Sequence, residues 1–564
     1  MAKAGHAYPQ VVPRAADLMD SRVITAQGRW PVDRALAAAR AVGASIIVAD
    51  PKTAARREDL ERAAAWGLGR APWTDVAHAG LPAVSLTTDE IAVRRLLRGG
   101  ASIVLVRDVR RVVGAIEASP HPTASLAGRL ERLHGSQGEA RLWLLRTAGK
   151  LAEAHGHAAY AVGGFVRDLM LGRGADQMAD VDLVVEGDGV AFGRRLAEET
   201  GGHLVVHAAF GTALLEGGVT PDGTRVGRVD IATARRERYA QPGALPEVSP
   251  AGIDEDLGRR DFSVNAMAVA LLPSAWGRLH DPWGGAEDVA ARRLRVLHHL
   301  SFVEDPTRIW RGARYAARLG LRPDAGFRRA LALAIRVGLY PVLSGQRLRA
   351  ELDLVMDEAD PWRALGLVLG WGALKLWDAS YRVTSRSRAR LAAARVFLRW
   401  ARGARIAVDG PGLALLALLF DQSRPVADRC VRRLAIAGGP GAPVDAGAAR
   451  ALARRLGSMG PRRASRVAEA LRPVRDGLLF GAWLAGGRAG RRDIEWFLRE
   501  GRSERPLSSG DDVVAAGVPR GPLVGQAIGI LRDLKLDGRV RTLDEERAAV
   551  TEWVKALATK GDLR

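Results

Sequence analysis

The chain has 564 residues, enough for roughly three or four domains. Its formal net charge of +21 favours a protein that binds nucleic acid over a basic protein without a polyanionic partner. Its longest apolar run, Leu413–Phe420, is too short to span a membrane, and the first ten residues lack the apolar segment of a signal peptide. Cys430 is the only cysteine, which excludes an internal disulfide framework and favours a cytoplasmic location.

Residues 1 to about 18 are predicted to be a tail, and an internal repeat follows them. The sequence GASIIV at Gly43–Val48 recurs as GASIVL at Gly100–Leu105, 57 residues later. In each copy an extended start leads through a helical segment, rich in Ala and Arg, to a buried strand. A repeat of this length predicts two similar supersecondary units that pack together.

Residues 19–118, which contain the repeat, resemble a CBS-domain pair, a module that often senses adenosyl ligands. The run Val112–Ile116 fits the last strand of such a module, and Asp59 lies where these domains can hold a ribose. The resemblance implies either an adenosyl ligand or a dimer contact, and we favour a structural or dimerising role. Pro120, Pro122 and Gly135 then predict a linker over 119–140.

A helix is expected from about Glu139 to Glu153, followed by a short apolar strand that ends at Val162. Gly163 and Gly164 come next and open a second helix, which carries Arg167. A Gly-Gly turn exposes backbone N–H groups, an arrangement that suits a triphosphate.

Asp180 and Asp182 begin the following apolar run, and their spacing places both side chains on one face of a strand. Two carboxylates at the end of a strand suit Mg²⁺, which takes oxygen ligands and usually shares its shell with phosphates. Each motif alone is more often a solvated strand end or an ordinary turn. Their combination predicts a metal-dependent site that acts on a nucleotide.

Farther along, Asp230 lies on another predicted strand. It either completes a carboxylate cluster with Asp180 and Asp182 or is an ordinary solvated residue. The polar stretch Ala234–Asp256, which contains several prolines, predicts a mobile loop.

A charged helix is predicted after Glu304, because Pro306 suits a first helical turn. The side chains predicted to share one face of it, because they are three residues apart, are Asp305, Arg308, Arg311 and Arg314. The plain interpretation of such spacing is an exposed charged face.

Asp305 and Arg308 also have the chemistry to recognise a base. Cytosine and adenine each present an amino donor beside a ring-nitrogen acceptor, so a carboxylate can accept from the first while a guanidinium donates to the second. Uracil and guanine present the reverse order and would leave buried groups unsatisfied. The pair therefore predicts selection of C and A over U and G without a nucleic-acid template.

Several motifs together resemble the class II tRNA nucleotidyltransferase and bacterial poly(A) polymerase family, of the DNA polymerase beta superfamily. They are GGFVRD followed by DVDLVV, RRDFSVNAMA at Arg259–Ala268, LHDPWGGAED at Leu279–Asp288 and EDPTRIWRGARYAARLG from Glu304. The resemblance is dense over Leu142–Trp377 and thinner toward both ends.

The resemblance implies roles for the predicted site residues. Asp180 and Asp182 would hold two Mg²⁺ ions. The residues that would bind the nucleotide are Gly163, Gly164, Arg167, Arg260, Asp261, Asp305, Arg308, Arg311 and Arg314. Arg347 and Glu351, four residues apart, could pair along a helix in a structural role.

The implied fold is α/β followed by all-α. A DNA polymerase beta-type head (141–275) precedes a helical neck with the nucleotide-selecting helix (276–345), a helical body (346–480) and a helical, tRNA-binding tail (481–564). In the tail, the basic turn Gly517–Pro522 is either a phosphate contact or a plain interhelical loop.

The implied activity is addition of C and/or A from CTP and ATP to a tRNA 3′ end, with release of pyrophosphate. The choice among CCA-adding, A-adding and CC-adding stays open, since the discriminating features lie in the 234–256 loop, and poly(A) polymerase is the nearest alternative. Two alternatives come from other classes. One is a catalytically silent RNA-binding protein, which the presence of both Asp180 and Asp182 disfavours; the other is an adenosyl-sensing regulator centred on the repeat.

Overall fold

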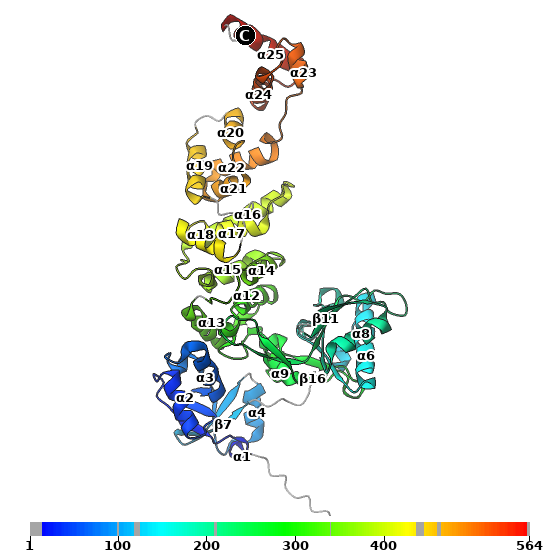
Figure 1. Cartoon of the computed structure of the whole chain (residues 1–564), viewed down its shortest axis with the longest axis vertical. Helices are drawn as coiled ribbons and strands as arrows, with labels where there is room; N and C mark the ends of the chain where they lie inside the picture. Colours follow the sequence, from blue (N-terminus) through cyan, green and yellow to red (C-terminus); the bar gives the residue numbers. More distant parts are fainter. Residues whose placement is uncertain are drawn as a thin grey trace, which may run out of the picture. The chain divides into compact units, whose positions relative to one another are not determined.

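The computed structural model of the chain (Figure 1) describes residues 14–98, 101–117, 125–207, 211–338, 340–435, 445–459 and 464–560. Residues 1–13 of the predicted tail, Gly100 of the repeat and residues 119–124 of the predicted linker lie outside this part. The chain forms two compact units. Met1–Arg347 with Glu358–Asp360 make the first, and Leu348–Asp357 with Pro361–Arg564 make the second.

The internal sequence repeat is a structural repeat. In each copy the first strand pairs parallel to the second, which pairs antiparallel to the third. The strands are β1 (Val23–Thr25), β2 (Ile46–Asp50) and β3 (Thr53–Arg56) in the first copy, and β5 (Ala83–Ser85), β6 (Ile103–Asp108) and β7 (Arg111–Glu117) in the second. Ile46 and Val48 share one buried cluster with Ile103 and Leu105, so the two copies pack together as predicted.

The described ends of the predicted tail and linker are packed rather than extended. Ala15 opens a short helix, α1 (Ala15–Leu18), and is fully buried against the second copy of the repeat. In the linker, Leu126 donates its backbone N–H to the carbonyl of Gly277 at 2.7 Å, and α5 (Ala127–Leu130) follows. Buried apolar side chains hold both segments in place. The proline and glycine content of the linker did not predict this packing.

The head segment contains one seven-stranded mixed sheet. Its strand order is β10 (His203–His207), β11 (Thr212–Glu216), β12 (Val229–Thr233), β9 (Val181–Glu186), β8 (Ala158–Val162), β15 (Ala268–Ala270) and β16 (Leu279–His280). β9 and β12 pair parallel at the centre, and their other neighbours pair antiparallel.

Helices cover both faces of the central strands. The expected helix before β8 is α6 (Gly135–Ala154), and it lies with α8 (Gly189–Thr200) beside the sheet (Figure 1). On the other face, Val184 packs with side chains of α9 (Ile253–Gly258). Asp182 shares this face with Val184, because side chains two apart in a strand point the same way. The end of α9 therefore lies next to Asp182.

The stretch predicted to be a mobile loop is largely ordered secondary structure. β13 (Arg235–Arg238) and β14 (Glu247–Pro250) form an antiparallel pair, and α9 follows them. The main chain of Ala234 donates to Val185 and accepts from Ala251, which anchors both ends of the hairpin to the sheet. Proline and charge content predicted a loop, whereas this long-range pairing makes it a hairpin.

The neck is helical around an aromatic core. Its main elements are α11 (Ser301–Glu304), α12 (Thr307–Leu319) and α13 (Ala325–Val337). Phe302 and Phe327 meet edge to face, with ring centroids 4.9 Å apart, and Trp310 is fully buried. This packing fixes α12, which carries Arg308 of the predicted base-recognition pair.

In the second unit, the described residues from Pro361 onward form helices and turns only, as the sequence predicts. The longest apolar run forms most of α17, which is buried in the helical core. No helix in the described part of the chain combines the length and apolarity needed to cross a membrane. The α-helices are α15 (Pro361–Gly370), α16 (Ser385–Gly403), α17 (Gly410–Leu419), α18 (Arg424–Arg433), α19 (Ala446–Ser458), α20 (Ala464–Leu471), α21 (Asp476–Ala485), α22 (Arg488–Trp496), α23 (Gly510–Ala515), α24 (Pro522–Leu536) and α25 (Leu543–Lys560).

Gly149 tests the packing of α6 against the sheet. A Cβ at this position would overlap the backbone carbonyl of Leu271, so we expect Gly149→Ala to destabilise the protein by about 1–3 kcal/mol despite the better helix propensity of Ala. The control is Gly366→Ala in α15, where a Cβ meets nothing within 4 Å and should raise stability by up to about 1 kcal/mol. Calorimetric unfolding of both variants checks this; equal shifts would contradict the close approach.

Candidate active site

Strand register brings the predicted carboxylates together. Asp182 on β9 lies directly beside Asp230 on β12, and on its other side it is in register with Val162, the last residue of β8. Gly163 follows Val162, so the turn and two carboxylates meet at one end of the central strands. Asp180 precedes β9 and is exposed.

The three carboxylates lie within one another's electrostatic field. Burial raises the pKa of Asp182 to about 6, and the charges of Asp230 and Asp180 add to this rise. The guanidinium groups of Arg260 and Arg167 oppose it. Such a raised pKa marks a site short of positive charge, which a bound cation would supply. Within the described residues, no group of three or more acidic, histidine or cysteine side chains is arranged to hold a metal ion.

Gly163 allows the close approach of these groups. Its φ of +68° is in the left-handed region, and a Cβ here would lie 3.0 Å from Nη1 of Arg260 and 3.4 Å from Oδ2 of Asp182. Its own N–H donates to the carbonyl of Met267. The turn therefore leaves space beside Asp182 rather than offering this particular N–H to a ligand. Gly164 begins α7 (Gly164–Met170).

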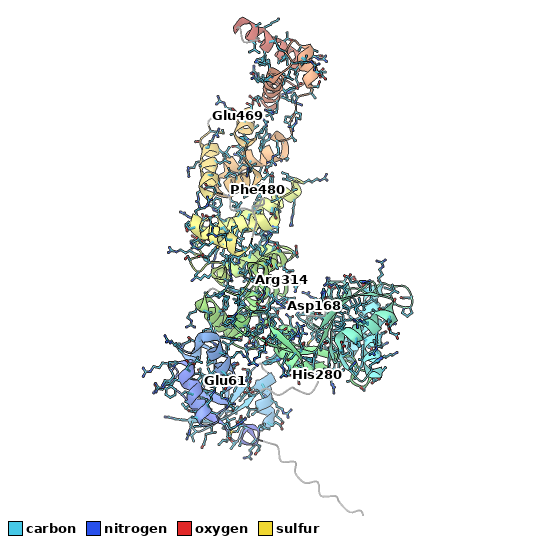
Figure 2. The ribbon with its side chains drawn as sticks, viewed as in Figure 1. Glu61, Asp168, His280, Arg314, Glu469 and Phe480 are labelled. Carbon is cyan, nitrogen blue, oxygen red and sulfur yellow. The ribbon has the colours of Figure 1, made fainter. Side chains whose placement is uncertain are left out.

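Arg167 is buried and joins two of the sequence motifs. Its Nε donates to Asp168, which Figure 2 labels in the head, at 3.0 Å. Its Nη1 donates to the side-chain oxygen of Asn265 at 2.7 Å. The predicted phosphate ligand thus has side-chain partners on its own helix and in the segment Arg259–Ala268.

Asp256 holds the two arginines that begin this segment, a role that the sequence motifs did not identify. It is fully buried, and its oxygens lie 2.6 Å from Nη2 of Arg259 and 3.0 Å from Nη2 of Arg260. Burial raises the pKa of Asp256, but the charges of Arg260 and Arg259 outweigh burial and hold the pKa below its usual value. The spacing of three and four residues along a helix was the signal that could have revealed it.

Asp261 is buried as well, with 4% of its surface exposed. It forms an ion pair of 2.8 Å with Arg311 of α12 and accepts a hydrogen bond from Asn265. The structure therefore places this predicted nucleotide contact between head and neck. It ties the RRDFSVNAMA segment to the predicted base-recognition helix.

The predicted base-recognition pair is held in place by neighbouring side chains. Asp305, in the connection before α12, accepts from the hydroxyl of Thr307 at 2.6 Å and from Arg347 at 2.9 Å. Arg308 is 4% exposed and donates to the carbonyl of Arg259 at 2.9 Å.

Farther along α12, the row of arginines diverges. Arg311 faces Asp261 in the head, whereas Arg314, labelled in Figure 2, pairs with Glu358 at 3.1 Å. The predicted common charged face is thus divided among separate partners.

The expected pairing of Arg347 with Glu351 gives way to a more distant partner. Besides binding Asp305, Arg347 donates to the carbonyl of Gly243 in the hairpin loop at 2.7 Å. Arg347 lies near the start of α14 (Gly345–Met356), and helical side chains point toward the N-terminus. It therefore reaches back to the preceding segments instead of forward along its own helix.

Comparison with known proteins identifies the relatives of this site. Residues 159–295 match the model of the poly A polymerase head domain. The A-adding tRNA nucleotidyltransferase of Geobacter sulfurreducens is 42% identical over 232 residues, which are 41% of this chain and 25% of that protein. The CC-adding tRNA nucleotidyltransferase of Deinococcus radiodurans is 35% identical over 402 residues, which are 70% of this chain and 89% of that protein.

The chain belongs to the tRNA nucleotidyltransferase family. In agreement, the structure of the Thermotoga maritima CCA-adding enzyme complexed with tRNA_CCA aligns with a TM-score of 0.63 at 25% identity and covers 77% of this chain and all of that one. The chain spans only a quarter to a half of the length of two A-adding relatives, from Geobacter sulfurreducens and Halalkalibacterium halodurans. The expected fold, a nucleotidyltransferase head followed by helical regions, is confirmed.

Substitution of Asp256 tests the charge network of this site. Asp256→Asn removes the anion shared by two partly buried guanidinium groups, and Arg259 keeps only its ion pair with Glu237. We therefore expect a loss of about 3 kcal/mol in unfolding free energy at pH 7. Because the folded-state pKa is lowered, the unfolded chain takes up the proton first as pH falls. The difference in unfolding free energy between Asp256→Asn and the wild type should therefore shrink below about pH 4.

Urea unfolding at pH 7 and pH 3 measures this difference. Glu255→Gln is the control, since the pair of Glu255 with Arg236 is exposed and should contribute about 0.5 kcal/mol or less. An effect of Asp256→Asn that stays constant with pH would rule out the ionic role.

Proposed function

We propose that the protein adds C and/or A from CTP and ATP to the 3′ end of tRNA, without a nucleic-acid template, and releases pyrophosphate. The observation that carries this proposal is the register that places Asp182 beside Asp230, with Gly163 and Arg260 against them. Membership of the tRNA nucleotidyltransferase family supports the substrate class.

Mg²⁺ fits the carboxylates on chemical grounds. Asp180 and Asp182 would hold it, with Asp230 as a further oxygen donor. Burial, together with the charges of Asp230 and Asp180, raises the pKa of Asp182, and a bound cation would stabilise the ionised carboxylate. When bound, the metal supplies Lewis-acid activation of the primer's terminal hydroxyl and charge stabilisation of the triphosphate.

The protein's own residues bind and orient the substrates. Arg260 lies beside the space that Gly163 leaves open, where its charge can bind a phosphate group. Arg311, which is partly exposed, adds a second positive charge from the neck. Phosphoryl transfer depends mainly on positioning and on charge stabilisation, so the buried anchors Asp256 and Asp261 contribute by fixing these arginines.

Asp305 and Arg308 would select the base. The carboxylate accepts from the amino group of C or A, and the guanidinium donates to the adjacent ring nitrogen. Arg347 and the carbonyl of Arg259 hold the two side chains from outside the base-recognition helix. A pair held in this way cannot rearrange freely to suit U or G, and this supports discrimination by the protein alone.

The other regions have proposed roles that follow from the same family. The helical tail would bind tRNA, and the exposed Arg520 in the turn before α24 suits a backbone phosphate. We propose that residues 19–118 form a CBS-like pair in a cytoplasmic enzyme. Asp59 there is buried 3.7 Å from Nε2 of His78, which supports a structural or dimer-forming role over ribose binding by an adenosyl ligand.

Primer extension tests the proposed reaction. The full chain is incubated with Mg²⁺, with CTP, ATP or both, and with tRNA that ends before the CCA tail, after C or after CC. ATP addition only to the CC-ended tRNA indicates an A-adding enzyme, two C additions indicate CC-adding, and complete tails indicate CCA-adding. Long A tails on generic RNA indicate poly(A) polymerase, and RNA binding without extension indicates a silent RNA-binding protein.

In the same assay, Asp182→Ala and Asp180→Ala should lower incorporation by more than about 100-fold, because transition-state charge stabilisation is lost. Asp176→Ala is the matched control, since Asp176 is an exposed carboxylate in the same connection and has no proposed role. Incorporation by Asp182→Ala at the control's rate would refute the metal-site assignment.

Asp305→Ala tests base selection separately from chemistry. We expect the ratio of kcat/KM for CTP or ATP to that for UTP or GTP to fall roughly 10- to 100-fold, because one charged hydrogen bond to the base is lost. Arg318→Ala on α12, which removes an ion pair to Glu358, should leave the ratio unchanged. An unchanged ratio in Asp305→Ala would remove this carboxylate from base selection.

A further inference from the structure

The N-terminal repeat contacts both Glu304, next to the base-selecting pair Asp305 and Arg308, and Tyr239, just after strand β13. Arg62 at the end of α3 (Arg57–Ala63) forms an ion pair with Glu304, its Nη1 lying 3.0 Å from Oε1. Glu61, labelled in Figure 2, marks the same helix. In the following turn, Trp66 donates its indole N–H to the carbonyl of Tyr239 at 3.2 Å. These residues line a cavity of about 1,090 Å³ between the repeat, the hairpin and the neck.

Glu304 links the first contact to the base-selecting pair. It immediately precedes Asp305, and only 6% of it is exposed. Its Oε1 faces Arg62, whereas its Oε2 lies 3.5 Å from Nη1 of Arg308 and 3.1 Å from Nε2 of His298. Its backbone carbonyl accepts from the N–H of Gly243 in the hairpin loop. A single buried carboxylate thus couples the repeat to Arg308.

Tyr239 links the second contact to the same arginine. Trp66 holds its main chain, and its hydroxyl accepts from Nη2 of Arg308 at 3.3 Å while donating to Glu237 at 3.0 Å. Burial raises the pKa of the Tyr239 hydroxyl, so it stays a neutral hydrogen-bonding group. The two links meet at different nitrogens of one guanidinium.

We propose that Arg62 and Trp66 of the N-terminal repeat are positioning residues for base selection: they fix Arg308 through Glu304 and Tyr239. This inference rests on the proposed function, because it concerns the orientation of the base-selecting guanidinium. Removing Arg62 would leave Glu304 with Arg308 and His298 alone and draw Arg308 toward it. Removing the indole N–H of Trp66 would release the Tyr239 main chain.

Two other contacts between the repeat and the neck involve neither Glu304 nor Tyr239. Arg336 of α13 pairs with Asp75 at 2.9 Å, and Arg329 donates to the carbonyl of Ala79. Both contacts join the repeat to the neck, but neither involves a residue that binds Arg308. Arg336→Ala is therefore a matched control for a purely structural effect of weakening this interface.

The test uses the full chain with Arg62→Ala, Arg62→Lys, Trp66→Phe and Arg336→Ala. Single-nucleotide addition to tRNA gives kcat and KM for CTP, ATP, UTP and GTP, and equilibrium binding of the same nucleotides is measured without primer. We expect Arg62→Ala and Trp66→Phe to lower the preference for CTP or ATP over UTP and GTP about tenfold, with a smaller change in kcat for the preferred nucleotide. Arg62→Lys should restore most of the preference, and Arg336→Ala should keep all of it.

An unchanged preference in both Arg62→Ala and Trp66→Phe overturns the inference, as does an equal loss for all four nucleotides. Trp66→Phe and Arg62→Lys are conservative, so they keep the test valid if Arg62→Ala fails to fold. If wild type extends no tRNA, the proposed function fails, whereas the binding preferences still decide whether Arg62 and Trp66 control base recognition.

Discussion

The parallel register of β9 and β12 is the constraint on which the rest of the site depends. It places Asp182 directly beside Asp230, and two carboxylates in partly buried surroundings repel each other. The fold offsets this repulsion with Arg260, which the buried Asp256 holds in turn. The positive φ of Gly163 keeps the space between them clear. Anionic and cationic groups thus alternate from Asp182 through Arg260 to Asp256.

The same principle extends into the neck. Asp261 fixes Arg311, and Arg347 fixes Asp305, so each side chain proposed to meet the nucleotide has a charged partner behind it. Arg308 has one charged partner, Glu304, and neutral acceptors in the hydroxyls of Ser301 and Tyr239 and the carbonyl of Arg259. A guanidinium with several fixed acceptors loses little further freedom when it binds a base, and this favours rigid discrimination over adaptive binding.

Local patterns predicted the elements of the site but not its long-range connections. The Gly-Gly turn and the helix after Pro306 follow from turn chemistry, and the structure has both. Asp182 lies on β9 as its spacing predicts, whereas Asp180 precedes the strand instead of sharing a face of it. Local spacing could not predict the partner of Arg347, because Asp305 comes within reach of Arg347 only in the folded chain. Likewise, the composition of 234–256 predicted a loop, and only the pairing of Arg238 with Glu247 makes a hairpin of it. The assignments of metal and nucleotide ligands remain predictions.

The shared core of the N-terminal repeat affects how the protein folds during synthesis. Ile46 and Val48 of the first copy bury their side chains against Ile103 and Leu105 of the second, contacts that span more than fifty residues of chain. The first copy therefore leaves the ribosome before the strands that cover Ile46 and Val48 have been synthesised. Contacts of such sequence separation form slowly, whereas helical segments with local contacts form fast. The N-terminal part of the chain is consequently the stage of synthesis at which chaperone binding has the most exposed apolar surface to protect.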